Sequence, residues 1–315
     1  GDGGGDLWGL GLPIWIWLPG AGLGAALVGL IIAPVAVRLR GLYLAIVTLG
    51  LVFIGIHLGN TDLGRKFAGD PGLGRDFPGF DIRLWKEDTP LISIDDDGHW
   101  LWFDISSEAK RYLFVAVLAL MFIVLATNLA RSRTGRALQA IRDRDIAAEV
   151  MGVPEFKYKM IAFSISSFFA GVAGGLFASL SGKLPATQFN LLLSVTFIAI
   201  LVIGGAGTVA GTLLGTFFVV LSPELVEKFT EWLSEQIEQG GVLGWVADIF
   251  LSEGSGDQGP ISVATQTPGY PLNVFDWNQI IYGLLIIVFL IFEPLGLYGI
   301  WLKIKTYWKR WPFSY

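Results

Sequence analysis

Three glycines, Gly204, Gly205 and Gly207, interrupt an apolar run and are the residues most similar to a phosphate-binding loop. A P-loop also needs a lysine followed by serine or threonine, because the lysine reaches the phosphates and the hydroxyl binds magnesium. No such pair follows these glycines, and the pattern G-x-x-x-x-G-K-[ST] occurs nowhere in the chain. We therefore expect this chain to bind no ATP through a P-loop.

Other chemistry has few candidate residues. The chain has no cysteine and two histidines, His57 and His99, which are too few for a thiolate or histidine-based metal site. The acidic run Asp95–Asp97 is better explained as a solvated loop than as a cation site. No Ser/His/Asp set and no pair of carboxylates stands out within the apolar stretches. We predict no catalytic residue, no metal and no cofactor, and hence a chain that is not an enzyme.

A charged segment over residues 132–154 separates two apolar stretches and has the pattern of one amphipathic helix. Its apolar positions recur at steps of four, seven and three, on one stripe: Ala137, Ile141, Ala148 and Met151. The rest of its surface is charged: Arg136, Arg142, Asp143, Arg144 and Asp145. Gly152 and Pro154 predict the end of the helix, because glycine accepts the left-handed conformation and proline cannot continue a helix.

Two interpretations of this charged segment are open. It could be a solvated connector, or it could be a rigid helix that docks on a partner protein. Small residues permit close approach by another surface, and a solvated connector has no need of them: Ala137, Ala140, Ala147 and Ala148. This pattern favours docking.

The composition of the chain predicts which kind of element flanks the charged segment. The chain of 315 residues is 53% hydrophobic and 16% charged, with a mean hydropathy of +0.60, which is typical of an integral membrane protein. Its apolar runs approach or reach the roughly 20 residues that a membrane-spanning helix needs. We predict an all-α, polytopic transmembrane helix bundle, as one domain over residues 1–315, with spans at about 13–37, 42–58, 112–130, 160–180, 192–206, 208–222 and 279–297.

The apolar run 192–222 is too long for one ordinary span, and the glycines at 204–207 divide it into two short halves. We expect two short spans or a re-entrant hairpin. The free backbone groups at this break could line a translocation path, or the break could be a kink needed for packing. The sequence supports both interpretations equally.

Charge predicts the sidedness of the chain. If 192–222 crosses an even number of times, three basic regions share one side: Arg38 and Arg40, the seven Lys and Arg of 131–159, and the C-terminal tail. The acidic segments 60–111 and 223–276 then form outer loops. The positive-inside rule places the basic side, and with it the loop 131–157, in the cytoplasm. Lys110 and Arg111 depart from this rule.

The acidic segment after Pro223 is expected to be separate from the span before it. Within this segment, apolar residues alternate with Glu and Gln in two groups: Phe229, Trp232, Leu233 and Ile237, then Val242, Trp245, Ile249 and Phe250. They predict one or two amphipathic helices that lie on the outer membrane surface or cap the bundle.

The span at 160–180 carries small residues at every fourth position. One series is Ser167, Gly171 and Gly175, and a second is Ser166, Ala170, Gly174 and Ala178. This spacing lets helix backbones touch inside a bilayer. Packing within one subunit and contact with a second subunit explain it equally well.

Four runs of the chain resemble the permease subunits of branched-chain amino-acid ABC importers. They are RLRGLYLAIVTLGLVFI at 38–54, TGRALQAIRDRDIAAEVMGVPEFKYKMIAFSISSFFAGVAGGLFA at 134–178, FIAILVIGGAGTVAGTLLGTFFVVLSPEL at 197–225 and FEPLGLYG at 292–299. The second run is similar to the family's ATPase-coupling loop, which ends in glycine. The resemblance implies a coupling role for these residues: Gly135, Arg136, Ala140, Arg142, Asp143, Asp145, Ala147, Ala148 and Gly152.

The same resemblance implies the setting of the chain. It would be a multi-pass subunit of the cytoplasmic membrane, surrounded by lipid and with no nucleic acid. It would pair with a homologous second permease subunit, ABC ATPase subunits and an extracytoplasmic substrate-binding protein. The chain departs from the family by having nothing that matches the family's N-terminal helices, by an insertion at 226–276 and by Glu293 in the final turn.

The alternative functions differ in the transported molecule or in the source of energy for transport. Relatives in this family imply urea or amides as other cargo for an ABC permease. An ion-coupled secondary transporter is a weaker alternative, because the predicted span interiors contain no Asp, Glu, Lys or Arg. A membrane scaffold that transports nothing is weaker still.

Overall fold

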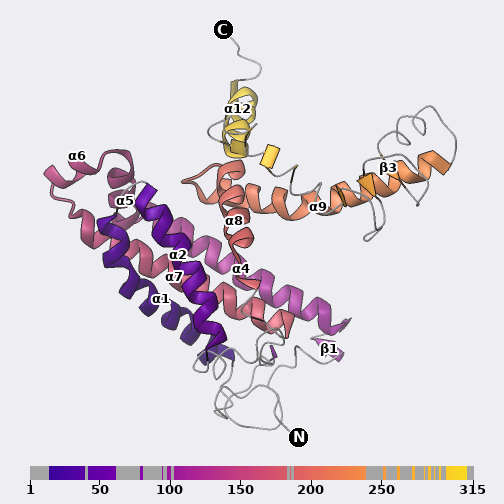
Figure 1. The fold of residues 1–315 in the computed structure, drawn as a ribbon, viewed down its shortest axis with the longest axis horizontal. Helices are drawn as coiled ribbons and strands as arrows, with labels where there is room; N and C mark the ends of the chain where they lie inside the picture. Colours follow the sequence, from indigo (N-terminus) through magenta and orange to yellow (C-terminus); the bar gives the residue numbers. More distant parts are fainter. Residues whose placement is uncertain are drawn as a thin grey trace, which may run out of the picture. The chain divides into compact units, whose positions relative to one another are not determined.

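A computed structural model gives the fold (Figure 1). It describes residues 14–39, 42–61, 103–182, 188–238 and 296–310, with shorter pieces between them. The chain divides into two compact units, residues 1–191 and 192–315, and each is described by itself.

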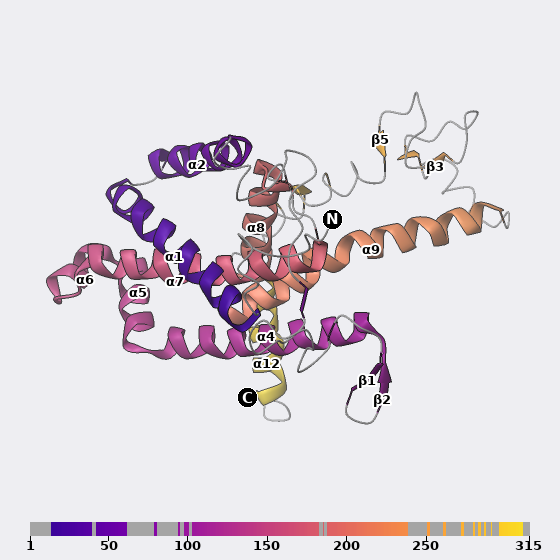
Figure 2. The ribbon, with the colours of Figure 1, turned by 90° about the horizontal axis from the view of Figure 1, so that it is seen from below.

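The first unit is a helical bundle with one β-hairpin. Its elements are α1 (Ile14–Arg38), α2 (Leu42–Asn60), β1 (Gly98–Trp100), β2 (Phe103–Ile105), α4 (Ser107–Arg131), α5 (Arg133–Asp143), α6 (Asp145–Val150) and α7 (Glu155–Ser181). β1 and β2 pair antiparallel, with His99 opposite Asp104. α5 and α6 lie at one end of α4 and α7, and the hairpin lies at the other end of α4 (Figure 2). The predicted sidedness requires this separation of the charged loop from the hairpin.

The core of this unit lies between α1, α4 and α7. Ile14, Trp17, Leu18 and Val172 are buried there. From α4, Phe122 stacks on Phe168 of α7 with ring centroids 6.4 Å apart. The aromatic rings of α4 thereby join it to the tightly packed pair formed by α1 and α7.

The second unit contains α8 (Leu191–Gly204), α9 (Val209–Glu238) and α12 (Gly296–Arg310). Three short strands form a parallel sheet in the order β3 (Leu251–Ser252), β4 (Ile261–Ser262) and β5 (Leu272–Asn273). The core is an apolar cluster of Ala199, Ile200, Ile203 and Val219, and Leu297 packs against it.

In the part of the chain that the structure describes, three helices are long and apolar enough to cross a membrane: α1, α4 and α7. α8 and the first part of α9 form a bent pair, with 120° between them, which could provide a fourth span. The apolar part of α2, Ile46–Asn60, is shorter. The predicted span 279–297 lies mostly outside the described residues. The fold is therefore the predicted all-α membrane bundle with a broken segment.

The helix that ends the broken segment is longer than the predicted span. We expected a span at about 208–222, and α9 continues past it through Pro223 to Glu238. Proline lacks the N–H that would donate to the carbonyl of Val219. The Ser222 hydroxyl donates to that carbonyl instead, at 3.2 Å, so the helix continues without an orphaned acceptor. The first expected amphipathic helix of the outer segment is thus the end of α9, whereas the second, from Val242 to Phe250, lies outside the described residues.

The C-terminal tail also differs from the prediction. We expected only a basic tail after the last span, but residues 296–310 form the helix α12. Gly296, at φ +62°, begins this helix in the left-handed region.

Candidate functional site

The charged segment forms an elbow that joins α4 to α7, and we call residues 132–152 the elbow. Its first corner is Ser132, which ends α4 and caps α5. The Ser132 hydroxyl donates to the Leu129 carbonyl at 2.7 Å and accepts from the Gly135 N–H at 3.2 Å. One serine therefore satisfies orphan groups of both helices, which fixes the angle at which α5 leaves α4.

Gly135 lies buried inside this corner. A Cβ added there would lie 2.6 Å from the carbonyl carbon of Ala130 and closer still to the carbonyl oxygens of Leu129 and Ala130. These are backbone atoms that cannot rotate away. Next to it, Arg136 is exposed, and its Nη1 donates to the Arg131 carbonyl at 2.8 Å. The absence of a side chain at Gly135 thus lets α5 start close to the end of α4.

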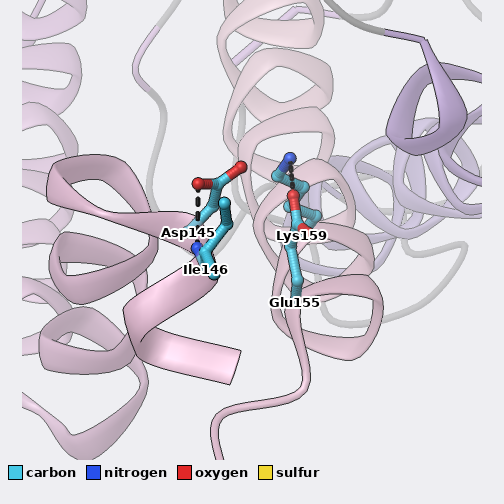
Figure 3. A network of polar contacts seen from close by, with 4 residues as sticks. All are labelled: Asp145, Ile146, Glu155 and Lys159. Atoms are coloured by element: carbon cyan, nitrogen blue, oxygen red, sulfur yellow. Dashed lines mark hydrogen bonds and ion pairs between the residues drawn. The ribbon is translucent and has the colours of Figure 1, made fainter. Parts of the chain in front are cut away.

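The prediction of one continuous helix over 132–154 is wrong at Arg144. This residue is extended, at φ −154° and ψ 97°, and separates α5 from α6. Asp145 favours a new helix start here, since short polar side chains bond to nearby backbone groups. Asp145 Oδ1 accepts from the Ile146 N–H at 2.8 Å (Figure 3). Asp145 also places a negative charge in the first turn of α6, which the helix dipole favours.

The predicted stop at Gly152 is confirmed as a C-terminal cap. Gly152 has φ +85°, in the left-handed region. Its N–H donates to the Glu149 carbonyl at 2.9 Å, and the Val153 N–H donates to the Ala148 carbonyl at 3.0 Å. This pair of bonds is the Schellman motif, which satisfies the last carbonyls of α6. The chain then enters α7, whose first turn carries an ion pair between Glu155 and Lys159 (Figure 3).

The predicted coupling residues all lie on the elbow, but on different sides of it. Gly135 and Ala148 are buried, and Asp145 is partly buried. The others are exposed: Arg136, Ala140, Arg142, Asp143, Ala147 and Gly152. Of the predicted apolar stripe, Ile141 and Ala148 are buried and Ala137 is partly buried, whereas Met151 points outward. The stripe therefore packs against the protein's own helices along most of its length.

An apolar surface that the sequence analysis missed lies on the outer side of α6. Ile146, Val150 and Met151 are 73%, 82% and 83% exposed, and we call these three residues the α6 tip. The spacing of Ile146 and Val150, four residues apart, could have indicated it. The prediction of one continuous helix over 132–154 hid this spacing, because in such a helix the apolar face runs through Ile141. The elbow thus presents an apolar tip on a short helix with fixed ends.

The small residues of α7 pack inside the first unit. A Cβ on Gly171 would lie 2.5 Å from Ala25 Cβ of α1. A Cβ on Gly29 of α1 would lie 2.7 Å from Ser167 Cβ. A Cβ on Gly175 would lie 3.0 Å from Cζ3 of the Trp17 ring. These contacts favour packing within one subunit as the role of the series Ser167, Gly171 and Gly175, the first of the two interpretations.

The glycine break between α8 and α9 is a close contact of backbones. A Cβ on Gly204 would lie 3.0 Å from Gly215 Cα, and one on Gly215 would lie 2.9 Å from the Gly204 nitrogen. Gly205 and Gly207 turn the chain with φ +110° and +92°. This geometry favours the packing interpretation over a path lined by free backbone groups, since other backbone fills the space beside Gly204.

Four residues that the sequence analysis missed also build this break. Thr208 Oγ1 accepts from the Gly211 N–H at 3.0 Å and so caps the start of α9. Gly211 and Gly215 are four residues apart, a spacing that could have identified them. Gly296 of α12 contacts the same turn, because its Cβ position is 2.6 Å from the Gly205 nitrogen. No sequence pattern linked Gly296 to this turn.

Within the described residues, no group of three or more His, Asp or Glu side chains could hold a metal ion. The fold and the elbow define a multi-pass membrane subunit whose most distinctive feature is a capped, partly apolar loop between two spans. Residues 5–290 match the family model described as "Branched-chain amino acid transport system / permease component". The chain belongs to this family.

Individual relatives agree with the family. The chain is 34% identical over 233 residues to the high-affinity branched-chain amino acid transport system permease protein LivM of Escherichia coli (strain K12). This alignment covers 70% of the chain and 53% of that relative, so the chain spans about half its length. The chain is also 34% identical over 109 residues to the autoinducer 2 import system permease protein LsrC of Enterobacter sp. (strain 638), covering 32% of each. No solved structure matches the chain.

Proposed function

We propose that this chain is the membrane-spanning permease subunit of an ABC importer for branched-chain amino acids. Separate ATPase subunits would bind and hydrolyse ATP, a second homologous permease subunit would complete the pathway, and an extracytoplasmic binding protein would deliver the cargo. The chain itself would perform no covalent chemistry, consistent with its lack of a P-loop.

The observation that carries this proposal is the α6 tip. Three exposed apolar side chains on a helix of six residues gain nothing from water, and their burial against a protein would be favourable. Both ends of α6 are fixed, by Arg144 and by the Schellman motif at Gly152. A partner that moves the tip would therefore move α5 as well, together with the ends of α4 and α7 that α5 contacts.

This arrangement suggests how ATP could drive transport. Nucleotide binding elsewhere would change the position of the docked elbow, and α4 and α7 would follow. The bundle would then shift between outward-open and inward-open populations, because the ATPase contacts one state better than the other. The exposed charges Arg142 and Asp143 beside the tip would set the orientation of the partner.

The identity of the cargo is proposed from the relatives. The alignment with the branched-chain amino acid permease covers 70% of the chain, whereas those with autoinducer 2 permeases cover 32% to 47%. This difference favours branched-chain amino acids over other cargo. Competition of unlabelled leucine, isoleucine and valine against urea and small amides in an uptake assay would test the choice.

The test replaces two apolar side chains of the α6 tip by polar ones. Ile146→Ser with Val150→Ser should abolish most ATP-driven uptake in proteoliposomes that contain the whole importer, and should release the ATPase subunits during purification. The matched control is Ile146→Leu with Val150→Ile, which keeps the surface apolar and should preserve both. Unchanged uptake in the serine variant would reject docking at the α6 tip. Uptake driven by an ion gradient without ATPase subunits would reject the ABC assignment itself.

A further inference from the structure

Most apolar residues of the C-terminal helix α12 share one face, whereas its lysines lie on the opposite side together with Tyr298 and Leu302. At 100° per residue, six apolar side chains fall within one sector: Leu297, Ile300, Trp301, Ile304, Tyr307 and Trp308. Lys303, Lys305 and Lys309 fall outside that sector, with Thr306 between them. The apolar residues follow the spacing i, i+3, i+4, i+7 of a helix that lies along a surface.

Only the first turn of α12 is covered by the rest of its unit. Gly296 and Gly299 are buried, and Leu297 packs against the cluster around Ile203. Residues 301–309 are all exposed, including Tyr307 at 69% and Trp308 at 71%. Large aromatic side chains thus extend from a helix whose base is fixed against the α8–α9 break.

We propose that α12 lies along the cytoplasmic surface of the membrane and binds anionic lipid. Tryptophan and tyrosine favour the level of the headgroups, where one part of the ring is apolar and another is wet. A helix with aromatic and aliphatic residues on one face and lysines on the other is the pattern of an interfacial helix. The lysines are complementary to the negative charge of the cytoplasmic leaflet.

The start of α12 is held against the broken membrane segment. Gly296 has φ +62°, and its Cβ position lies 2.5 Å from the Ile203 carbonyl and 2.6 Å from the Gly205 nitrogen. The chain therefore enters α12 through a turn that is fixed on the broken membrane segment. This inference rests on the membrane setting of the family and on the charge-derived sidedness, and it is independent of the cargo and of the ATPase.

Because the chain has no native cysteine, single labels can test the proposal in the full-length permease. Nitroxide labels would be placed by Ile300→Cys, Ile304→Cys, Lys305→Cys and Lys309→Cys. The permease would be reconstituted without ATPase subunits into vesicles of phosphatidylcholine with phosphatidylglycerol. Labels at 300 and 304 should be accessible to oxygen, which dissolves in lipid, and labels at 305 and 309 to a water-soluble nickel complex. Equal nickel accessibility at all four positions would overturn the proposal.

A second experiment tests the contribution of the lysine charges to lipid binding. Lys305→Gln with Lys309→Gln should weaken the attraction to an anionic surface by about fivefold per lysine, so more phosphatidylglycerol would be needed to shield the label at 304. Thr306→Val is the control, because it changes an exposed side chain on the same helix without changing its charge. Shielding of the label at 304 that appeared only after addition of the ATPase subunits would assign the face to a protein and overturn the lipid proposal.

Discussion

The hydroxyl of Ser222 donates a hydrogen bond to the carbonyl of Val219, the acceptor that Pro223 leaves without its usual backbone donor. Ser222 is buried, so water does not readily replace this bond. The side chain of Ser222 therefore supplies a hydrogen-bond donor at the point in α9 where the proline supplies none.

This dependence predicts a specific double-mutant cycle. Ser222→Ala should lower the free energy of unfolding by about 1 kcal/mol, because the hydrogen bond from the Ser222 hydroxyl to the Val219 carbonyl is lost. In a Pro223→Ala background the alanine N–H can make the bond, and the same Ser222→Ala change should cost much less. Thermal unfolding of the four proteins in detergent would measure the coupling. Equal costs in both backgrounds would show that the hydroxyl does not compensate for the proline.

At the elbow, Gly135→Ala is predicted to open the corner between α4 and α5. The added methyl would collide with the backbone of Leu129 and Ala130, at a cost of about 1–3 kcal/mol. We expect ATP-driven uptake to fall while membrane insertion is retained. Gly24→Ala is the matched control, because nothing lies within 4 Å of its Cβ position. Full uptake in the Gly135 variant would show that the corner can relax.

Gly152→Ala tests backbone strain without steric crowding. Its Cβ position is open, but φ +85° is unfavourable for alanine by about 1–2 kcal/mol. The end of α6 should therefore fray, which faster amide exchange at position 152 and at Val153 would reveal. Gly152→Asn should exchange more slowly than the alanine variant, since asparagine tolerates this conformation better. Identical exchange in all three proteins would contradict a role for the positive φ.

The two faces of α7 should respond differently to a large side chain. Gly171→Leu should separate α1 from α7, because its Cβ position already lies 2.5 Å from Ala25 Cβ. Gly174→Leu should leave the isolated subunit stable, since its surroundings are open. Thermal stability of the purified subunit would compare them. If Gly174→Leu then failed to assemble with the second permease subunit, the face of Ser166, Ala170 and Gly174 would be the contact between subunits.

Thr208→Val should destabilise the start of α9 by about 1 kcal/mol, because the Gly211 N–H loses its capping oxygen. Thr208→Ser keeps that oxygen and is the control. Amide exchange at Gly211 should accelerate in the valine variant and not in the serine variant. Protection of Gly211 in both variants would indicate another acceptor for its N–H.

Hydropathy was sufficient to predict where α1, α4 and α7 lie, because a long apolar run without charges has few alternatives to a membrane helix. The same pattern could not predict local chain geometry. Arg144 interrupts the elbow, and Pro223 fails to interrupt α9, because single side chains, those of Asp145 and Ser222, bond to nearby backbone groups.

For the elbow, the sequence predicted the region and its final glycine but not the exposed tip. Helical periodicity assigns faces only if the helix is continuous, and the break at Arg144 turned Ile146 and Val150 outward. The contacts of Gly296 with Ile203 and Gly205 were beyond prediction for another reason. They join segments about ninety residues apart in sequence, and no local pattern encodes such a meeting.

The contact between Gly204 and Gly215 also bears on how the molecule can move. No side chain separates the two backbones, and the Gly215 Cβ position lies 2.8 Å from Gly204 Cα. Separating them would forfeit dispersion contacts at their shortest range. We therefore expect α8 and the start of α9 to move together as one wedge, and conformational change in this unit to occur at the margins of that wedge.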